Sequence, residues 1–217
     1  MATNKLVKLV KIPGLLRYSE GLKLQHRLWT LSKDHRLNYL ILCEHSPVYT
    51  FGKRQSQGDL SIEIGRLQGL GAECHTTPRG GLTTFHGPGQ LVCYPILNLR
   101  NFKSSAKWYI NQLEELVIST CGEMGVSAAR CEHVGIWVGA NKVCALGVNI
   151  RTRCTTHGLA LNCSTDLDWF ESIVPCGIEG RGVTSLSREK GREVGVEGVS
   201  EVMVREFQTI MECTVVK

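Results

Sequence analysis

Apolar residues recur along this chain with two different periods, and the change from one period to the other predicts an α/β fold. Short runs in which apolar and polar residues alternate, bounded by turn residues, are typical of strands. Apolar residues three and four positions apart are typical of helices that bury one side. Strands are expected at residues 5–12, 39–43, 72–76, 90–99, 135–138, 142–150 and 154–163.

Helices are expected between these strands and near the end of the chain. Ser19 would cap the first helix, and Asp59 would cap a short second helix that Gly69 ends. Ser104 or Ser105 would open the most regular helix, and a last helix is expected from about residue 200 to residue 211. The inner stripe of the most regular helix would consist of Ile110, Leu113, Leu116, Val117 and Cys121.

Glycine and proline residues mark the connections. Gly139-Ala140-Asn141 would close a β-hairpin, while Pro13-Gly14 would end the first strand. Pro95 indicates an edge strand or a bulge, because proline has no N–H for a sheet. Loops are expected at residues 44–58, 172–182 and 187–198. Since no repeat or linker divides the chain, the sequence predicts one α/β domain over residues 1–217, a mixed β-sheet flanked by helices.

Composition narrows the class of protein. The chain has 217 residues, of which 42% are apolar and 21% charged, as in ordinary globular domains. Its longest apolar stretch, residues 91–97, is far shorter than the roughly 20 residues of a membrane-spanning helix. The net charge of +5 is modest, and the basic residues are not clustered as in nucleic-acid-binding proteins. We therefore expect neither a membrane span nor a nucleic-acid partner.

Cysteine usage indicates a reducing compartment. The chain has ten cysteines, several of them inside apolar strand-like runs, and no Cys-x-x-Cys pair that would indicate structural zinc. Free buried thiols are therefore expected. The basic start, with Lys5, Lys8, Lys11 and Arg17, leaves two interpretations open, a mitochondrial presequence or a first strand. Its richness in Leu and Val favours the strand.

Residues 79–90, Arg-Gly-Gly-Leu-Thr-Thr-Phe-His-Gly-Pro-Gly-Gln, form the densest candidate site. Glycines let a backbone approach a ligand closely and expose its N–H groups. The run leads directly into a predicted strand, an arrangement suited to a substrate cradle. It lacks the Gly-Lys-Ser/Thr of a phosphate loop and the glycine spacing of a dinucleotide-binding fingerprint.

Cys176 is the candidate nucleophile. It lies between Pro175 and Gly177 in a segment expected to be irregular, where a thiol can be presented to a substrate. A resting thiol needs a nearby cation or base to react, and Lys142, His86 and His157 are candidates for that role. Cys144 remains a rival nucleophile, because it lies two residues from Lys142 on the same predicted strand.

These motifs resemble the lipoyl (octanoyl) transferase family, the octanoyl-carrier-protein:protein octanoyltransferases. The resemblance spans about residues 39–186, and the stretch from residue 162 to residue 177 looks most like the animal mitochondrial branch. The sequence departs from the commoner bacterial pattern at Leu82, Phe85 and Cys144. The motifs that carry the resemblance, in the family's order and spacing, are residues 47–50, 79–94, 142–147, 157–162, 175–177 and 182–186.

The resemblance implies a fold shared with biotin and lipoate protein ligases, and a two-step acyl transfer. Cys176 would receive an octanoyl group as a thioester, and Lys142 would lower the pKa of that cysteine. The residues that would bind substrate are Arg79, Gly80, Gly81, Leu82, Thr83, Thr84, Phe85, His86, Ala145, Leu146, Gly147, Gly158, Leu159 and Ala160.

The implied partners are octanoyl-acyl carrier protein as donor and, as acceptors, the lipoyl domains of the glycine cleavage H protein and of 2-oxoacid dehydrogenase E2 subunits. No cofactor or metal is expected, and the implied location is the mitochondrial matrix. An alternative is an ATP-dependent lipoate or octanoate ligase of the same fold, and another is a non-catalytic module that binds an acyl group. A metal-dependent hydrolase is disfavoured, since no two histidines have the His-x-x-x-His spacing.

Overall fold

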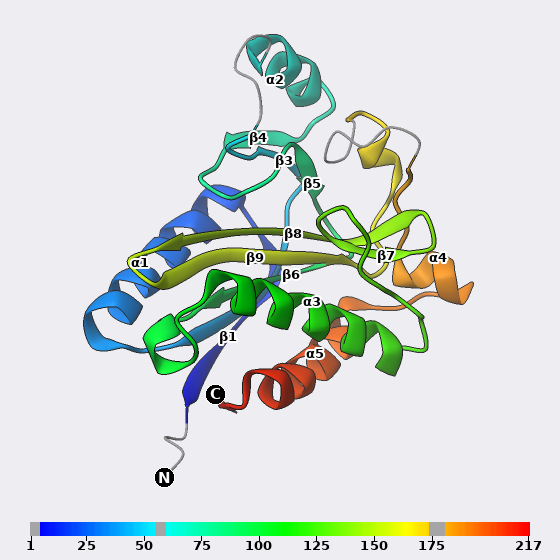
Figure 1. Cartoon of the computed structure of the whole chain (residues 1–217). Helices are drawn as coiled ribbons and strands as arrows, with labels where there is room; N and C mark the ends of the chain where they lie inside the picture. The colour runs from blue at the N-terminus through cyan, green and yellow to red at the C-terminus, as the bar shows by residue number, and fades with distance from the viewer. Residues whose placement is uncertain (1–4, 55–59, 174–180) are drawn as a thin grey trace.

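The computed structural model describes residues 5–54, 60–173 and 181–217, and these residues form two β-sheets with helices packed around them (Figure 1). The large sheet has the strand order β10-β1-β2-β6-β9-β8-β7, and the small sheet has the order β4-β3-β5. The strands of the large sheet are β1 (Leu6–Leu16), β2 (Tyr39–His45), β6 (Gln90–Ile96), β7 (Ile136–Val138), β8 (Asn141–Arg151), β9 (Cys154–Asn162) and β10 (Thr214–Val216). Those of the small sheet are β3 (Val48–Phe51), β4 (Glu73–Thr76) and β5 (Thr84–His86).

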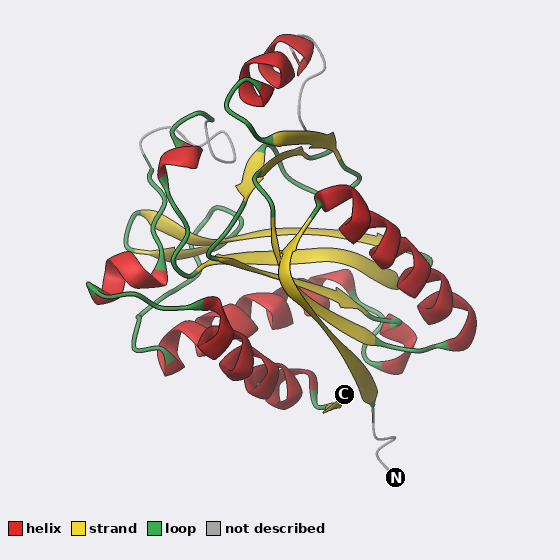
Figure 2. Ribbon diagram, turned by 180° about the vertical axis from the view of Figure 1, so that it is seen from behind, coloured by secondary structure: helices red, strands yellow, loops and turns green. Residues whose placement is uncertain are grey.

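Helices cover both faces of the large sheet (Figures 1 and 2). α1 (Tyr18–His35) packs on one face, where Leu28 joins an apolar cluster with Ile41 and Val92. α3 (Ala106–Glu123) and α5 (Val196–Met211) pack on the other face, where Leu113 and Phe207 join a larger cluster. The shorter helices are α2 (Leu60–Gln68) and α4 (Leu186–Lys190), with 3₁₀ turns at Leu99–Asn101 and Asp168–Phe170.

The predicted mixed sheet flanked by helices is confirmed. β1 pairs with β2 and β10 in parallel, while β2, β6, β9, β8 and β7 pair with one another antiparallel. The predicted hairpin is also confirmed, since β7 and β8 are joined at Gly139 and Ala140. A second hairpin joins β8 to β9 through Thr152 and Arg153, whose φ angles of 51° and 64° suit a tight turn between twisted strands.

The helix-capping predictions have different outcomes. Ser105 caps α3 as expected, since its side chain accepts a hydrogen bond from the N–H of Trp108 at 3.2 Å. The prediction for Ser19 is wrong: it lies inside α1, which begins at Tyr18 after Arg17 with no side-chain cap. The buried Tyr18 side chain holds this end of the helix by packing instead. Asp59 lies outside the described residues, and α2 ends at Gln68, just before Gly69.

The prediction that Pro95 marks an edge strand or a bulge is wrong. Pro95 lies in β6, which has β2 on one side and β9 on the other. The pairing of β6 with β9 stops after Cys93 opposite Leu159, and it resumes in the same register where Asn98 bridges Cys154. Proline therefore occupies a gap in the ladder, where no N–H is required. Its carbonyl accepts a hydrogen bond from the Thr155 hydroxyl at 2.7 Å.

Two segments expected to be loops contain regular structure. Residues 44–58 hold the end of β2 and the whole of β3, whose four residues are all buried between β4 and β5. Such a short run, buried on both faces, lacks the alternation that identifies a half-exposed strand. Residues 187–198 hold most of α4, which Ser185 caps, and the start of α5, four positions earlier than expected. Much of the third expected loop, residues 172–182, lies outside the described residues.

The start and the thiols of the described chain agree with the sequence. β1 is the expected first strand, although it continues past Pro13-Gly14 to Leu16 with a shift of register. The nine described cysteines are all free, and most are buried. Within the described residues, no helix is both long and apolar enough to cross a membrane.

Candidate active site

A narrow cavity lies between the loop that follows β4 and the middle of β8 and β9. We call it the first cavity, and the centre of a water molecule can move through about 30 Å³ of it. Its walls come from segments far apart in sequence: the start of α1, residues 79–86, β6, β8 and β9. The lining residues are Tyr18, Arg79, Gly81, Leu82, Thr84, His86, Tyr94, Ala145, Leu146, Gly147, His157, Gly158, Leu159 and Ala160.

The loop that begins at Arg79 is held down on β8 by its backbone. The N–H of Gly80 donates a hydrogen bond to the carbonyl of Val148 at 3.1 Å. Gly147 permits this approach, because a Cβ there would lie 3.1 Å from the carbonyl oxygen of Gly80 and 3.0 Å from the Arg79 side chain. The two motifs at residues 79–86 and 142–147, which are far apart in the sequence, are therefore in direct contact in the structure.

The structure brings most of the expected substrate-binding residues to this cavity, but it places three elsewhere. Gly80, Thr83 and Phe85 do not line the first cavity. Residues on a strand alternate between its faces, so Thr84 and His86 of β5 face the cavity while Phe85 faces away. The Phe85 ring is fully buried and stacks on Trp169, with 5.0 Å between ring centres. Its side chain therefore does not reach the first cavity, and a role in substrate binding stays a prediction.

Where β8 and β9 form the wall of the cavity, the residues that face it are small. Ala145 and Ala160 are directly opposite each other on the two strands, and Gly147 is opposite Gly158, while the side chains of Leu146 and Leu159 pack on the other face of the sheet, beneath α3 and α5. Leu82 contributes a further aliphatic side chain from the loop. A narrow slot of this composition suits an unbranched hydrocarbon chain, whose burial stabilises a complex by about 0.8 kcal/mol per methylene.

Arg79 is a buried cation at the mouth of the loop, with only 6% of its surface exposed. Its guanidinium donates to the carbonyl of Thr50 at 2.5 Å, to the Thr50 hydroxyl at 2.8 Å and to the carbonyl of Gly80 at 2.9 Å. These oxygens replace the water that burial removes from the charged group. The charge also disfavours protonation of the imidazoles nearby.

Three buried histidines lie near the cavity as neutral imidazoles. Burial lowers the pKa of His86 to about 3 and that of His157 to about 4, and it also lowers the pKa of His45. His86 Nδ1 donates to Oε1 of Gln90 at 2.8 Å, so its Nε2 is left as an acceptor. Gln90 in turn donates to Asn162 at 2.9 Å. This chain of hydrogen bonds fixes the orientation of the His86 ring.

Tyr18 and Tyr94 line the cavity but were not expected from the sequence. Tyr94 donates its hydroxyl proton to Nε2 of His45 at 2.8 Å, since His45 Nδ1 donates to the carbonyl of Leu16. The strand alternation of β6 could have identified Tyr94, which shares a face with Val92 and Ile96. Nothing in the local sequence distinguishes Tyr18, because only the position of α1 relative to the sheet brings it to the cavity.

Lys142 is the second residue of β8, three positions before Ala145. Only 4% of its surface is exposed, and Nζ lies 4.8 Å from the centre of the Trp137 ring. Its backbone N–H donates to the carbonyl of Gly182 and its carbonyl accepts from the N–H of Thr184, both at 2.9 Å. Lys142 is therefore a buried cation at the start of β8 rather than a solvated surface lysine.

The two candidate nucleophiles differ in the structure. Cys144 is fully buried in the apolar cluster beneath α3 and α5, and burial raises the pKa of its thiol well above the ordinary value. A thiol in this position is sealed from substrate and remains protonated. Cys176 lies outside the described residues, so its distance from Lys142 stays a prediction.

Within residues 5–54, 60–173 and 181–217, no three His, Cys, Asp or Glu side chains are grouped so as to hold a metal ion. The His45, His86 and His157 rings are instead occupied with hydrogen bonds and aromatic contacts to their neighbours.

The architecture defines the fold of the chain, which is that of the lipoate protein ligases. The structure superposes on that of lipoate-protein ligase A bound with ATP with a TM-score of 0.77, covering 99% of this chain and 90% of that one. The two sequences are only 14% identical, so this likeness concerns the fold. The expected resemblance to the ligase catalytic fold is confirmed.

Sequence similarity identifies the family. The model of the lipoyl protein ligase A/B catalytic domain matches residues 17–208, and the chain belongs to this family. It is 48% identical over 215 residues to octanoyl-acyl-carrier-protein:protein N-octanoyltransferase LIPT2, mitochondrial, of Danio rerio, covering 98% of this chain and 95% of that protein. The protein of the same name from Homo sapiens is 44% identical over 223 residues, covering 97% and 95%.

Proposed function

We propose that this protein is an acyltransferase that moves an octanoyl group from acyl carrier protein to a lysine of lipoyl-dependent proteins, the first step of protein lipoylation. The observation that carries the proposal is the narrow cavity bounded by residues 79–86 and the middle of β8 and β9, whose exposed lining is mostly apolar. Relatives that match nearly the whole chain at 44% and 48% identity are named for this reaction. Their names also support a mitochondrial location, which we propose to be the matrix.

The proposed reaction has two steps and needs no cofactor. The thiolate of Cys176 attacks the carbonyl carbon of the octanoyl thioester, and the bond to the carrier's sulfur breaks as the carrier's thiolate leaves. The amine of the acceptor lysine then attacks the new thioester and releases the Cys176 thiol. The first step exchanges one thioester for another, while the second forms a more stable amide, so no nucleotide is required to drive the transfer.

Lys142 has two roles in this scheme. As an ammonium it stabilises the Cys176 thiolate by Coulomb attraction, which is strong in a site with little water. As an amine it accepts the proton of the attacking lysine. The support for this placement is local: Gly182, six positions after Cys176 in the sequence, has its carbonyl hydrogen-bonded to the N–H of Lys142. Gly182, which follows Cys176 closely in the sequence, is therefore attached to the sheet at Lys142.

The residues around the first cavity bind the octanoyl chain in this proposal. The aliphatic walls hold the hydrocarbon, and the buried Arg79 and His86 fix the loop that covers it. Backbone N–H groups of the glycine-rich loop are the candidates for holding the oxyanion that forms at the carbonyl. The donor is octanoyl-acyl carrier protein. The acceptors are the lipoyl domains of the glycine cleavage H protein and of 2-oxoacid dehydrogenase E2 subunits, and the whole chain, residues 1–217, acts as one catalytic domain.

A mass measurement tests the proposal. The protein is incubated with octanoyl-acyl carrier protein without ATP, and the intact mass is expected to rise by one octanoyl group. Peptide fragmentation should then place the group on Cys176. Cys176→Ser should abolish the adduct, whereas Cys144→Ala, which removes a thiol sealed in the core, should leave it unchanged. Formation of octanoylated acceptor only from free octanoate plus ATP would establish the ligase alternative instead.

A further inference from the structure

A second cavity adjoins the first at His157, which lines both. It is far larger, since the centre of a water molecule can move through about 480 Å³ of it. Apolar surface comes from Leu22, Trp29 and Pro78, and cationic groups come from Lys53 and Arg151. The other lining residues are Gln25, His26, Asn149, Thr156 and His157.

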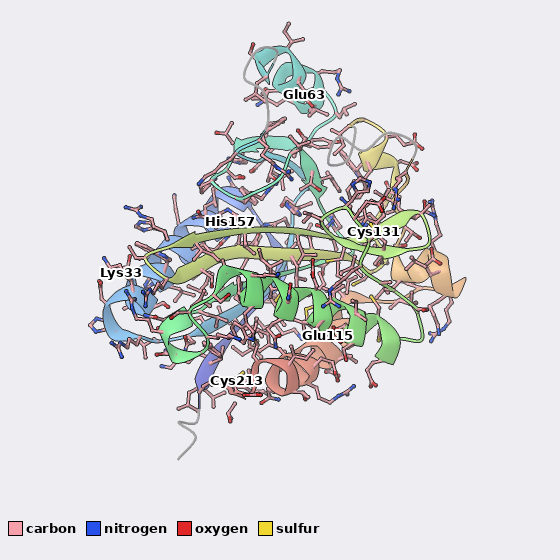
Figure 3. All side chains as sticks on the ribbon, in the orientation of Figure 1. Lys33, Glu63, Glu115, Cys131, His157 and Cys213 are labelled. Atoms are coloured by element: carbon pink, nitrogen blue, oxygen red, sulfur yellow. The ribbon has the colours of Figure 1, made fainter. Side chains whose placement is uncertain are left out.

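His157 belongs to the walls of both cavities. Its ring stands edge-on to that of Tyr94, which lines the first cavity, with 6.2 Å between ring centres. Its backbone N–H donates to the side chain of Gln25, which lines the second cavity, at 2.7 Å. Figure 3 labels His157 at β8 and β9, below the small sheet. His157 is therefore the residue that the linings of the two cavities share.

The backbone of His157 is turned so that the ring reaches this position. Its φ angle is +59°, in the left-handed region that a residue other than glycine seldom adopts. Strand alternation would put residue 157 on the same face as Leu159, which packs beneath α3 and α5. The ring instead contacts Tyr94, whose cluster lies beneath α1. Strained positions of this kind are concentrated at ligand-holding sites.

The residues of β8 show in which order the two cavities follow Lys142 along the strand. Lys142 comes first, then Ala145 and Gly147 of the first cavity, and then Asn149 and Arg151 of the second. His157 is paired with Val148, three residues after Ala145, which is about 10 Å along a strand. An extended eight-carbon chain is about 9 Å long, given carbon–carbon bonds of about 1.5 Å.

We propose that the His157 side chain is the end wall of the acyl cavity and sets the length of the acyl chain that the protein accepts, with the second cavity as the space a longer chain would enter. This inference rests on the proposed octanoyl transfer. An unbranched chain whose carbonyl carbon lies beside Ala145, on the side of Lys142, would run along β8 and meet the His157 ring near its eighth carbon. Within the described residues, Nε2 of that ring has no hydrogen-bond partner, while Nδ1 lies 3.3 Å from the Thr156 hydroxyl. The ring is therefore held by packing, by its backbone and by this one polar contact.

The test is His157→Gly in the full-length protein. Glycine adopts the left-handed backbone region without strain, so this variant removes the wall while suiting the fold. Transfer to a lipoyl domain is measured by acceptor mass, with acyl carrier protein loaded with octanoyl or dodecanoyl chains. The dodecanoyl-to-octanoyl ratio of kcat/KM should rise at least about tenfold, since each methylene newly buried is worth about a fourfold gain in binding. His157→Asn, which keeps a shorter side chain, should give an intermediate ratio.

Thr152→Gly is the matched control. Thr152 also has a positive φ, of 51°, but it is exposed in the β8–β9 turn and lines neither cavity. Relief of backbone strain alone would therefore change the chain-length ratio in both variants, whereas removal of the end wall changes it only in His157→Gly. An unchanged chain-length ratio in an active His157→Gly protein would overturn the inference.

The proposed function fails separately, if the wild-type protein transfers no octanoyl group from the carrier. In that case, and also if His157→Gly is inactive with every acyl chain, binding of free fatty acids tests the role of His157 without catalysis. Free dodecanoic acid should raise the melting temperature of His157→Gly more than octanoic acid does, and the order should be reversed in the wild-type protein. The same order in both proteins would also overturn the inference.

Discussion

The ammonium nitrogen of Lys142 lies 4.8 Å from the centre of the Trp137 ring, on a side chain that is almost completely buried. The guanidinium of Arg181 lies 5.2 Å from the centre of the same ring. The electron-rich face of an indole ring attracts both cations and replaces part of the hydration that Lys142 loses. Trp137 therefore helps to fix the Lys142 side chain in place. A carboxylate in this position would neutralise the charge of the lysine, whereas an indole ring does not.

Lys142→Ala should slow octanoyl transfer by about 100-fold or more, the usual effect of removing a positioned acid–base group. The loss of the ammonium should also move the pH–rate profile for formation of the enzyme adduct to higher pH, because the thiolate forms less readily. Stopped reactions over a range of pH, analysed by intact mass, measure both effects. Lys103→Ala, at an exposed position, serves as control. An unchanged profile in Lys142→Ala would remove the proposed role.

Lys142→Arg separates the two roles of the lysine. Arginine keeps a positive charge but does not lose its proton in proteins. The variant should therefore still form the octanoyl adduct, while transfer from the adduct to the acceptor lysine should slow by about 100-fold. Single-turnover experiments that follow the adduct and the acceptor amide separately give the two rates. Equal slowing of both steps would indicate that Lys142 acts only through its charge or its shape.

Cys144→Ala should affect stability rather than chemistry. The thiol is fully buried in the apolar cluster with Cys121 and Leu161, so its removal leaves a small cavity. The expected decrease in the free energy of unfolding is about 1 kcal/mol, in the range of a small core truncation. Urea denaturation measures this decrease, and adduct mass measures the chemistry. Loss of the adduct at unchanged stability would revive Cys144 as the nucleophile.

The sequence predicts the elements in which the local pattern of apolar and polar residues is set by the helix or strand itself. The hairpin of β7 and β8 follows from local pattern, and so do Leu113, Leu116, Val117 and Cys121 of the inner stripe of α3. The prediction is wrong for Ile110, which is only partly buried, because the helix turns Tyr109 into the core instead. β3 was missed because its four residues are buried on both faces by β4 and β5. Pro95 was misjudged because a gap in the pairing of β6 and β9 depends on the position of Thr155 in another strand.

The candidate site was predictable where it lies on contiguous motifs. Arg79 and His86 stand out as residue types suited to a cradle, Gly147 is implied by the family resemblance, and the structure brings all three to one cavity. The sequence motif does not show that the side chain of Phe85 faces away from the first cavity. This follows from β5, a strand within the glycine-rich run, in which alternate side chains point to opposite faces. Tyr18 reaches the cavity only through the packing of α1 on the sheet, which no local pattern encodes.

Stability should fall as the pH is lowered below about 6.5 because of the buried histidines. Burial lowers the pKa of His86 to about 3 and of His157 to about 4 in the folded state, whereas the value without the fold is 6.5. The unfolded chain therefore binds more protons below pH 6.5, and the stabilisation present above that pH is lost toward pH 4 and 3. Each such histidine should contribute a loss of about 1.4 kcal/mol per pH unit in this window.

Urea titrations at about pH 7.5, 6 and 5 measure this slope. His86→Gln should flatten it by the contribution of one histidine, because glutamine does not titrate and can retain a hydrogen bond to Gln90. His35→Gln, at an exposed position, provides the comparison and should leave the slope unchanged. A slope equal to that of the wild-type protein in His86→Gln would show that this imidazole does not stay neutral in the fold.

Gly147→Ala should narrow the first cavity. The added Cβ would lie 3.0 Å from Cδ of Arg79 and 3.1 Å from the carbonyl oxygen of Gly80, tighter than ordinary contact, so the loop must move from β8. We expect octanoyl transfer to fall by about 10-fold through a higher KM, since the loop that covers the chain is displaced while Lys142 is untouched. Steady-state kinetics with octanoyl-acyl carrier protein give kcat and KM separately. Gly122→Ala provides the matched control, because a Cβ at that position in α3 meets no atom within 4 Å. A fall in kcat with no change in KM would mean that the contact between Gly147 and the Arg79 loop positions the reacting groups rather than the acyl chain.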